Sequence, residues 1–237
     1  MKNILILTFL FLGIGCRQAD KQPCDDHYIK GNNYALALDF VNAEIEFNES
    51  IKQNSNNALA YYGLGGIAFL NGEFEKAIIE YDKSIEIDPA FAFAYYHKAS
   101  ALNSIGKNKE AKETIDNVIQ LKPQFFYGYY TRSTYRQSLG DIKGAADDLT
   151  KVIELNPTFG NAFYYRGCIN GELKNYKDAV KDLTTSIELR TGFVSAYTYK
   201  GYYECLLGEK EKGCEDIHKG KELGDTKADI YIDKYCK

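Results

Sequence analysis

The feature that most constrains this chain is an internal repeat with a period of 34 residues. Several residue types recur in one common phase, which is more agreement than chance would give. One small residue per repeat falls at Ala43, Ala77, Ala111, Ala145, Ala179 and Gly213. Glycines recur at Gly72, Gly106, Gly140 and Gly208, and prolines at Pro89, Pro123 and Pro157. A fixed period of this length indicates stacked supersecondary units, because one unit alone cannot bury its apolar face.

Each repeat is predicted to contain two amphipathic helices. In residues 58–91 the first apolar stripe consists of Tyr61, Leu64, Gly65 and Ala68, and the second of Phe74, Ala77, Tyr81, Ser84 and Ile85. Both stripes have the spacing of one helix face. The pair Asn71-Gly72 separates the helices. Pro89 ends the second helix, because the residue before a proline disfavours the helical conformation.

This pattern resembles the tetratricopeptide repeat (TPR). The resemblance rests on Tyr61-Tyr62-Gly63-Leu64-Gly65, Asn71-Gly72-Glu73-Phe74-Glu75-Lys76-Ala77 and Ser84-Ile85-Glu86-Ile87-Asp88-Pro89, repeated in phase. It implies an all-α fold, a right-handed α-solenoid of about six helix-turn-helix units with a C-terminal capping helix. The units would cover residues 24–57, 58–91, 92–125, 126–159, 160–193 and 194–227, and the cap residues 228–237. In the cap, Ile230 and Tyr231 are expected to face inward.

The chain begins with a segment that has the layout of a secretory signal peptide. Residues 1–15 read MKNILILTFLFLGIG, a stretch too short to span a bilayer as a permanent helix. The small residue before Cys16 resembles the lipobox of bacterial lipoproteins. That resemblance implies a lipidated Cys16, followed by a linker over residues 16–23, and an address in the bacterial cell envelope. Arg17 rather than Asp follows Cys16, which favours the outer membrane, with the chain on the periplasmic or exterior side. Secretion to the periplasm without an anchor is the alternative.

Oppositely charged residues recur at fixed positions of the last three units. Arg132, Arg166 and Lys200 share a position in the first helix, and Asp148, Asp182 and Asp216 share one in the second. The common phase predicts salt bridges between the two helices of each unit: Arg132–Asp148, Arg166–Asp182 and Lys200–Asp216. The same reasoning extends to Lys30 and Glu46. An anion-binding basic stripe is the alternative.

The chain has six cysteines: Cys16, Cys24, Cys168, Cys205, Cys214 and Cys236. If Cys16 carries lipid, at least one of the others is unpaired. Cys214 lies on the last second helix and Cys236 on the cap, so the two form either a disulfide or a pair of packed thiols. A disulfide requires their Cα atoms to lie within about 7 Å. Cys214 and His218 have the spacing of metal ligands on a helix, but no CxxC accompanies them, so we expect no metal or cofactor.

In the TPR family the first helices line a concave groove that binds peptides or partner helices. The resemblance places tyrosine at a groove-facing position of five units: Tyr28, Tyr62, Tyr96, Tyr130 and Tyr164. The same phase adds Asn32, Ser100, Asn103, Thr134, Gln137 and Glu172. Tyrosine has a large rigid face with a polar tip, which suits recognition of a peptide or stacking on a sugar ring. A purely structural role, in which these tyrosines only pack, is equally open.

The sequence therefore predicts a non-catalytic scaffold that binds a partner protein or peptide in this groove. A glycan- or peptidoglycan-binding module that uses the same tyrosines is the alternative. No P-loop, GxGxxG or nucleophile–base arrangement is recognisable, so we expect no enzyme activity. A net charge of −4 gives no basic excess for nucleic acid. Membrane contact is expected only through the lipid anchor.

Overall fold

The computed structural model describes residues 25–189 and 191–237. The expected signal peptide, the lipidation site Cys16 and the linker after it lie outside the described residues. Within them, all regular secondary structure is helical, in thirteen helices. None of these helices is long and apolar enough to cross a membrane.

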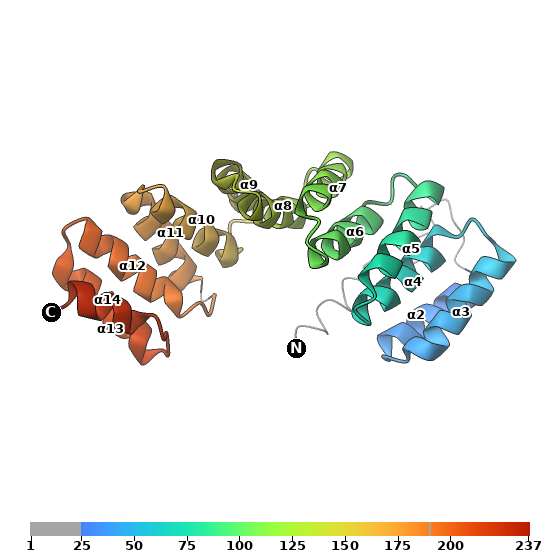
Figure 1. Ribbon diagram of the computed structural model, residues 1–237, viewed down its shortest axis with the longest axis horizontal. Helices are drawn as coiled ribbons and strands as arrows, with labels where there is room; N and C mark the ends of the chain where they lie inside the picture. The colour runs from blue at the N-terminus through green and yellow to red at the C-terminus, as the bar shows by residue number, and fades with distance from the viewer. Residues whose placement is uncertain (1–24, 190) are drawn as a thin grey trace. The chain divides into compact units, whose positions relative to one another are not determined.

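Twelve of the helices form six consecutive pairs, and a short helix follows the last pair (Figure 1). The chain divides into two compact units, Met1–Pro123 and Gln124–Lys237. The first unit holds α2 (Asp26–Leu36), α3 (Phe40–Gln53), α4 (Ala58–Leu70), α5 (Phe74–Ile87), α6 (Ala92–Ser104) and α7 (Asn108–Leu121). The second holds α8 (Phe126–Ser138), α9 (Ile142–Leu155), α10 (Gly160–Glu172), α11 (Tyr176–Glu188), α12 (Ser195–Leu206), α13 (Lys210–Glu222) and α14 (Ala228–Tyr235). The chain is thus an α-solenoid built of helix-turn-helix repeats, which fall into two units.

The turn inside each helix pair contains one residue in the left-handed conformation, at a spacing of 34 residues. Glycine occupies this position at Gly72, Gly106, Gly140 and Gly208, with φ between +78° and +90°. Leu38 and Lys174 adopt the same conformation with φ of 64° and 63°. The repeat therefore imposes this backbone geometry even where the residue carries a Cβ that disfavours it.

The core of the first unit is dominated by large aromatic side chains from successive repeats. Phe47, Tyr62 and Tyr81 are fully buried, and alanines fill the remaining space. Glycine allows the close approach of the helices: a Cβ added at Gly65 would stand 2.6 Å from the ring of Tyr81. The glycine in the first apolar stripe, Gly65, thus has a direct steric cause.

The core of the second unit combines aliphatic side chains with the buried rings of Tyr135, Tyr164 and Tyr203. Leu149, Ile169, Leu183 and Ile217 are fully buried on four different helices. At the end of the unit, α14 packs against α12 and α13.

The inward orientation expected for the two cap residues is only half right. Tyr231 is partly buried against Tyr199 and Tyr202, with ring centroids 6.3 and 4.8 Å away. The expectation for Ile230 is wrong, since its side chain is 67% exposed. Ala228, on the first turn of α14, is the cap residue that is completely buried.

Candidate functional site

The structure brings together the charged residues that share a phase in the second unit. Arg132 donates Nε to Oδ2 of Asp148 at 2.9 Å and Nη2 to Oδ1 at 2.6 Å. Arg166 binds Asp182 in the same two-pronged way, at 2.9 and 2.7 Å. Both carboxylates are nearly inaccessible to solvent. A bidentate pair of this kind joins the first and second helix of a repeat with defined geometry.

The third pair, Lys200–Asp216, is also formed, and it belongs to a larger charge cluster. Glu204 on the same helix lies 3.2 Å from Lys200 and 2.8 Å from Lys212. Burial raises the pKa of the Glu204 carboxyl, and the neighbouring Asp216 raises it further. Sequence reasoning missed Glu204, because no other repeat carries an acid at that position.

Basic residues at the repeat position of Arg132 also contact the preceding repeat. Lys98 lies 2.5 Å from Asp82, and Arg166 donates Nη1 to Oγ1 of Thr150 at 3.1 Å. Asp82 and Thr150 differ by two repeat lengths and so occupy equivalent positions. The shared repeat position of Asp82 and Thr150 is the sequence signal for this contact between repeats. The extension to Lys30 and Glu46 is wrong: Lys30 is exposed, and Glu46 instead pairs with Nδ1 of His27 at 2.6 Å.

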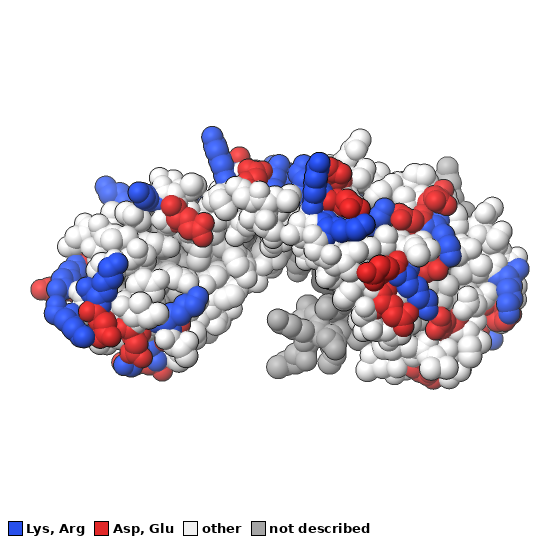
Figure 2. Space-filling model, in the orientation of Figure 1, with Lys and Arg blue, Asp and Glu red and all other residues white. Residues whose placement is uncertain are grey.

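The surface around Arg166 does not behave as a basic stripe. A pocket of about 290 Å³ there is lined by Ala146, Asp147, Thr150, Arg166, Asn170, Asp178, Lys181 and Asp182. Three carboxylates thus face two cations, so an anion would meet a net negative lining. Figure 2 shows the same character more widely, with charges of both signs in mixed clusters between neutral areas. The ion pairs therefore hold helices together rather than attract an anionic ligand.

The expectation that tyrosines at one repeat position face a ligand is wrong for three of the five. Tyr28, Tyr62 and Tyr164 are at most 9% exposed. Burial raises the pKa of each of these phenols well above its ordinary value. The cause is the close packing of the repeats: Tyr62, for example, lies against Tyr81 and Phe91, with ring centroids 5.8 and 5.0 Å away. Tyr96 and Tyr130 are partly exposed.

The polar residues expected in the groove differ in their surroundings. Asn103 is exposed, whereas Asn32 and Gln137 are half-buried. Among the others in phase, Thr134 and Glu172 are exposed and Ser100 is half-buried, with its hydroxyl donating to the carbonyl of Tyr96 at 3.2 Å.

Partly exposed aromatic rings nevertheless form a continuous row in the second unit. The ring of Tyr130 lies 5.1 Å from Phe159 and 6.0 Å from Tyr165. Tyr165 in turn lies 5.7 Å from Phe193, which stacks on the buried Tyr164 at 4.1 Å. All but Tyr164 are half-buried, so each remains partly accessible to solvent. We call Tyr130, Phe159, Tyr165 and Phe193 the aromatic row.

An apolar pocket adjoins the end of this row. It has a volume of about 290 Å³ and is lined by Ile187, Thr191, Gly192, Phe193, Val194, Tyr197 and Leu223. Phe193 belongs to both features, so the row leads directly into the pocket. The pocket lies at the repeat junction where Thr191 replaces the recurrent proline. Sequence reasoning did not find it, because it depends on how the loop before α12 meets α11, α12 and the end of α13.

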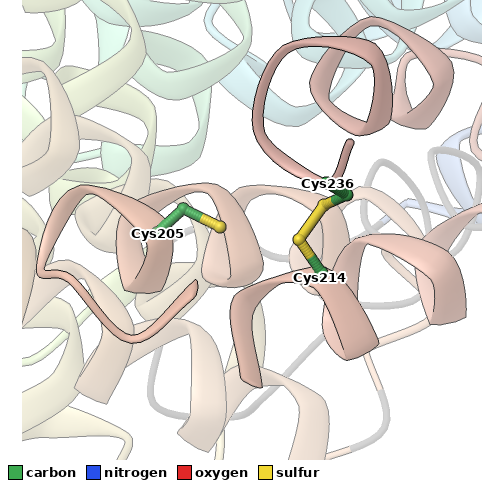
Figure 3. Close-up of side chains that lie close together, drawn as sticks. All are labelled: Cys205, Cys214 and Cys236. Atoms are coloured by element: carbon green, nitrogen blue, oxygen red, sulfur yellow. A yellow bond between two sulfur atoms is a disulfide. The ribbon is translucent and has the colours of Figure 1, made fainter. Parts of the chain in front are cut away.

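Three sulfur atoms gather at the C-terminal end of the chain (Figure 3). Cys214 and Cys236 form a disulfide with Cα atoms 5.5 Å apart. The alternative of two packed thiols is therefore wrong. Because that bond uses both sulfurs, Cys214 is not available to form a metal site with His218. Cys205 is a free thiol, and all three Sγ atoms lie within 4.8 Å of one another.

The comparisons with known proteins agree with the repeat geometry. Residues 58–91 and residues 94–125 match family models described as tetratricopeptide repeat. The chain contains tetratricopeptide repeats. No curated protein sequence matches the chain closely enough to count as a relative.

Solved tetratricopeptide-repeat structures share the fold. The structure of YrrB, described as a TPR protein with an unusual peptide-binding site, superposes with a TM-score of 0.71 at 23% identity, over 79% of this chain and 97% of YrrB. PilF of Pseudomonas aeruginosa gives a TM-score of 0.74 at 13% identity, over 88% of this chain and 96% of PilF. MamA gives 0.67 at 22% identity, over 74% of this chain and 96% of MamA. At these identities the similarity establishes the tetratricopeptide-repeat fold and nothing about ligands.

Proposed function

We propose that this protein is a non-catalytic scaffold that binds a segment of a partner protein on the aromatic row of its second unit. The observation that carries the proposal is the continuity between the row and the apolar pocket at Phe193. Rigid aromatic faces with polar tips bury contact area at low entropic cost. A pocket of about 290 Å³ can receive an apolar side chain of the same segment.

The family supplies general support. Tetratricopeptide repeats are interaction modules, and YrrB is described as having a peptide-binding site. The peptide site and its glycan alternative both relied on the same five tyrosines, and three of them are buried, whereas the apolar pocket at Phe193 suits an apolar side chain better than a sugar. A polypeptide segment is therefore the better-supported ligand.

A crosslinked pull-down from native membranes tests this proposal. The tagged protein would be compared with Tyr165→Ala and with a matched control, Tyr176→Ala, which removes a half-buried tyrosine from a second helix. We expect one protein to be captured by the wild type and the control and lost with Tyr165→Ala. Equal capture by all three, with each variant still showing a cooperative helical melt, would refute binding on the row. Capture of no protein, with binding to an oligosaccharide, would favour the glycan alternative.

We also propose that the chain is exported and held at a bacterial envelope membrane, with the outer membrane favoured, through lipid on Cys16. The apolar segment before Cys16 supports this proposal, and the Cys214–Cys236 disulfide is compatible with an oxidising compartment. Mass spectrometry of the membrane-fractionated protein should find Cys16 as a lipid-modified N-terminus. A Cys16→Ser variant should move to the soluble fraction. A full-length, unmodified N-terminus would refute this part of the proposal.

A further inference from the structure

The free thiol of Cys205 lies beside the only disulfide among the described residues. Cys205 is the penultimate residue of α12, Cys214 lies on α13, and Cys236 follows α14. Figure 3 shows the Cys205 side chain directed toward the bonded sulfurs. All three Sγ atoms lie within 4.8 Å of one another. Cys168, the other free cysteine among the described residues, lies on α10 and is not part of this group.

A local departure from the repeat creates this arrangement. The small position of the second helix is alanine in five units and glycine only at Gly213. A Cβ at Gly213 would stand 2.5 Å from Sγ of Cys205 and 2.5 Å from the carbonyl oxygen of Gly201. The missing Cβ lets α12 and α13 approach closely and leaves room for the Cys205 sulfur next to Cys214.

We propose that Cys205, Cys214 and Cys236 form a thiol–disulfide exchange site, in which the Cys205 thiolate attacks Sγ of Cys214. The Cys214–Cys236 bond breaks, a Cys205–Cys214 bond forms, and Cys236 leaves as a thiolate that takes up a proton. One disulfide and one thiol are present before and after, so the step needs no oxidant or reductant. Cys214 is the target because α12 and α13 are held together independently of the cap, through Gly201 and Gly213.

The exchange would change what the disulfide holds together. In the observed pairing it closes a loop with a sequence separation of 22 residues and ties the cap to α13. In the alternative pairing it joins two helices that already pack tightly, and α14 loses its covalent attachment. Burial raises the pKa of the Cys205 thiol, and the Glu204 carboxylate adds to that shift while Lys210 opposes it. Because only the thiolate attacks, the raised pKa of Cys205 slows the exchange.

Differential alkylation of the purified full-length protein tests the exchange. Free thiols are labelled in a short pulse with N-ethylmaleimide, the disulfides are then reduced, and the released thiols are labelled with the isotopic form of the reagent. Peptide mass spectrometry should find first-pulse label on Cys236 and second-step label on Cys205 in the same minor fraction. Cys205→Ser should lower first-pulse labelling of Cys236 by about tenfold or more. The matched control Cys168→Ser should leave it unchanged.

A second experiment isolates the attack on Cys214. In a Cys236→Ser variant, Cys214 is converted to its mixed disulfide with glutathione. We expect Cys205 to displace glutathione and form the Cys205–Cys214 bond, whereas the adduct should persist in Cys205→Ser/Cys236→Ser. Circular dichroism confirms that both variants are folded. Persistence of the adduct in both variants, or equal labelling of Cys236 with and without Cys205, would overturn the proposal.

Discussion

Arg166 binds both carboxylate oxygens of Asp182, sixteen residues further along the chain, through hydrogen bonds of 2.9 and 2.7 Å. Asn170 donates a third hydrogen bond to the same carboxylate at 3.1 Å, and Thr150 accepts one from Arg166 at 3.1 Å. Through these bonds Arg166 connects three successive helices, α9, α10 and α11. Its importance lies in the burial of Asp182, whose charge has little access to water.

Removing the positive charge of Arg166 while Asp182 remains should strongly reduce the stability of the fold. We expect Arg166→Met to lower the free energy of unfolding by about 3 kcal/mol, because it leaves a buried carboxylate without its counter-charge. The double variant Arg166→Met/Asp182→Leu should recover most of that loss. Urea denaturation measures both. Lys219→Met, which breaks an exposed pair with Glu222, is the control and should change stability by less than about 1 kcal/mol. A double variant as unstable as the single one would contradict the argument.

The left-handed turn position at Lys174 makes a second prediction. Lys174→Gly should raise the free energy of unfolding by up to about 1 kcal/mol, because glycine adopts φ of 63° without the Cβ clash. Lys181→Gly, at an exposed position in the interior of α11, should instead lower it by about 1 kcal/mol. Thermal melts of the two variants make the comparison. Equal destabilisation by both would show that the turn is not strained.

Because α12 and α13 approach closely at Gly213, alanine, which stands at this position in the other five repeats, should lower the stability of the protein here. Gly213→Ala should destabilise the protein by about 1–3 kcal/mol, because the new Cβ meets Sγ of Cys205 and the carbonyl oxygen of Gly201. Adding Cys205→Ala should restore part of the loss, since it removes the clash with Sγ while the backbone clashes remain. Denaturant melts of the single and double variants measure how much of the lost stability comes from the contact between residue 213 and Cys205. If Gly213→Ala left the free energy of unfolding unchanged, α12 and α13 would be able to move apart without cost.

His97 makes the stability of the first unit depend on pH. Burial among the rings of Tyr62 and Tyr81 lowers the pKa of His97 to about 3, against an ordinary value of 6.5. Below pH 6.5 the unfolded chain binds a proton at this residue, whereas the folded chain does not until about pH 3. The contribution to stability is therefore complete above pH 6.5 and is lost progressively down to about pH 3.

Urea melts between pH 7 and pH 4 check this dependence, through the difference between the wild type and His97→Phe. The variant should lose stability more slowly as the pH falls, by a slope of up to one proton per molecule. Substitution of the exposed His218 by Gln is the control and should leave the wild-type profile unchanged. Parallel profiles for the wild type and His97→Phe would refute a buried neutral imidazole.

The periodicity of the chain was sufficient to predict much of the fold. A 34-residue phase determines which residues share a structural position, and that determines the helix pairs and their turns. The same phase indicated Arg132–Asp148 and Arg166–Asp182, because partners with one spacing in every repeat meet in the same way each time. The period can be read from the sequence alone, because it depends only on which residues recur at a fixed spacing.

Only the tertiary structure decided whether the residue at a given repeat position is buried or exposed to solvent. Tyr62 and Tyr130 share a sequence position, yet one is buried and the other half-buried, because neighbouring side chains differ from repeat to repeat. Ile230, the pairing of Glu46 with His27, the pocket at Phe193 and the Cys205 contact depend in the same way on local packing. Sequence phase fixes positions along the solenoid, whereas exposure and contact depend on the shapes of neighbours that the phase does not specify.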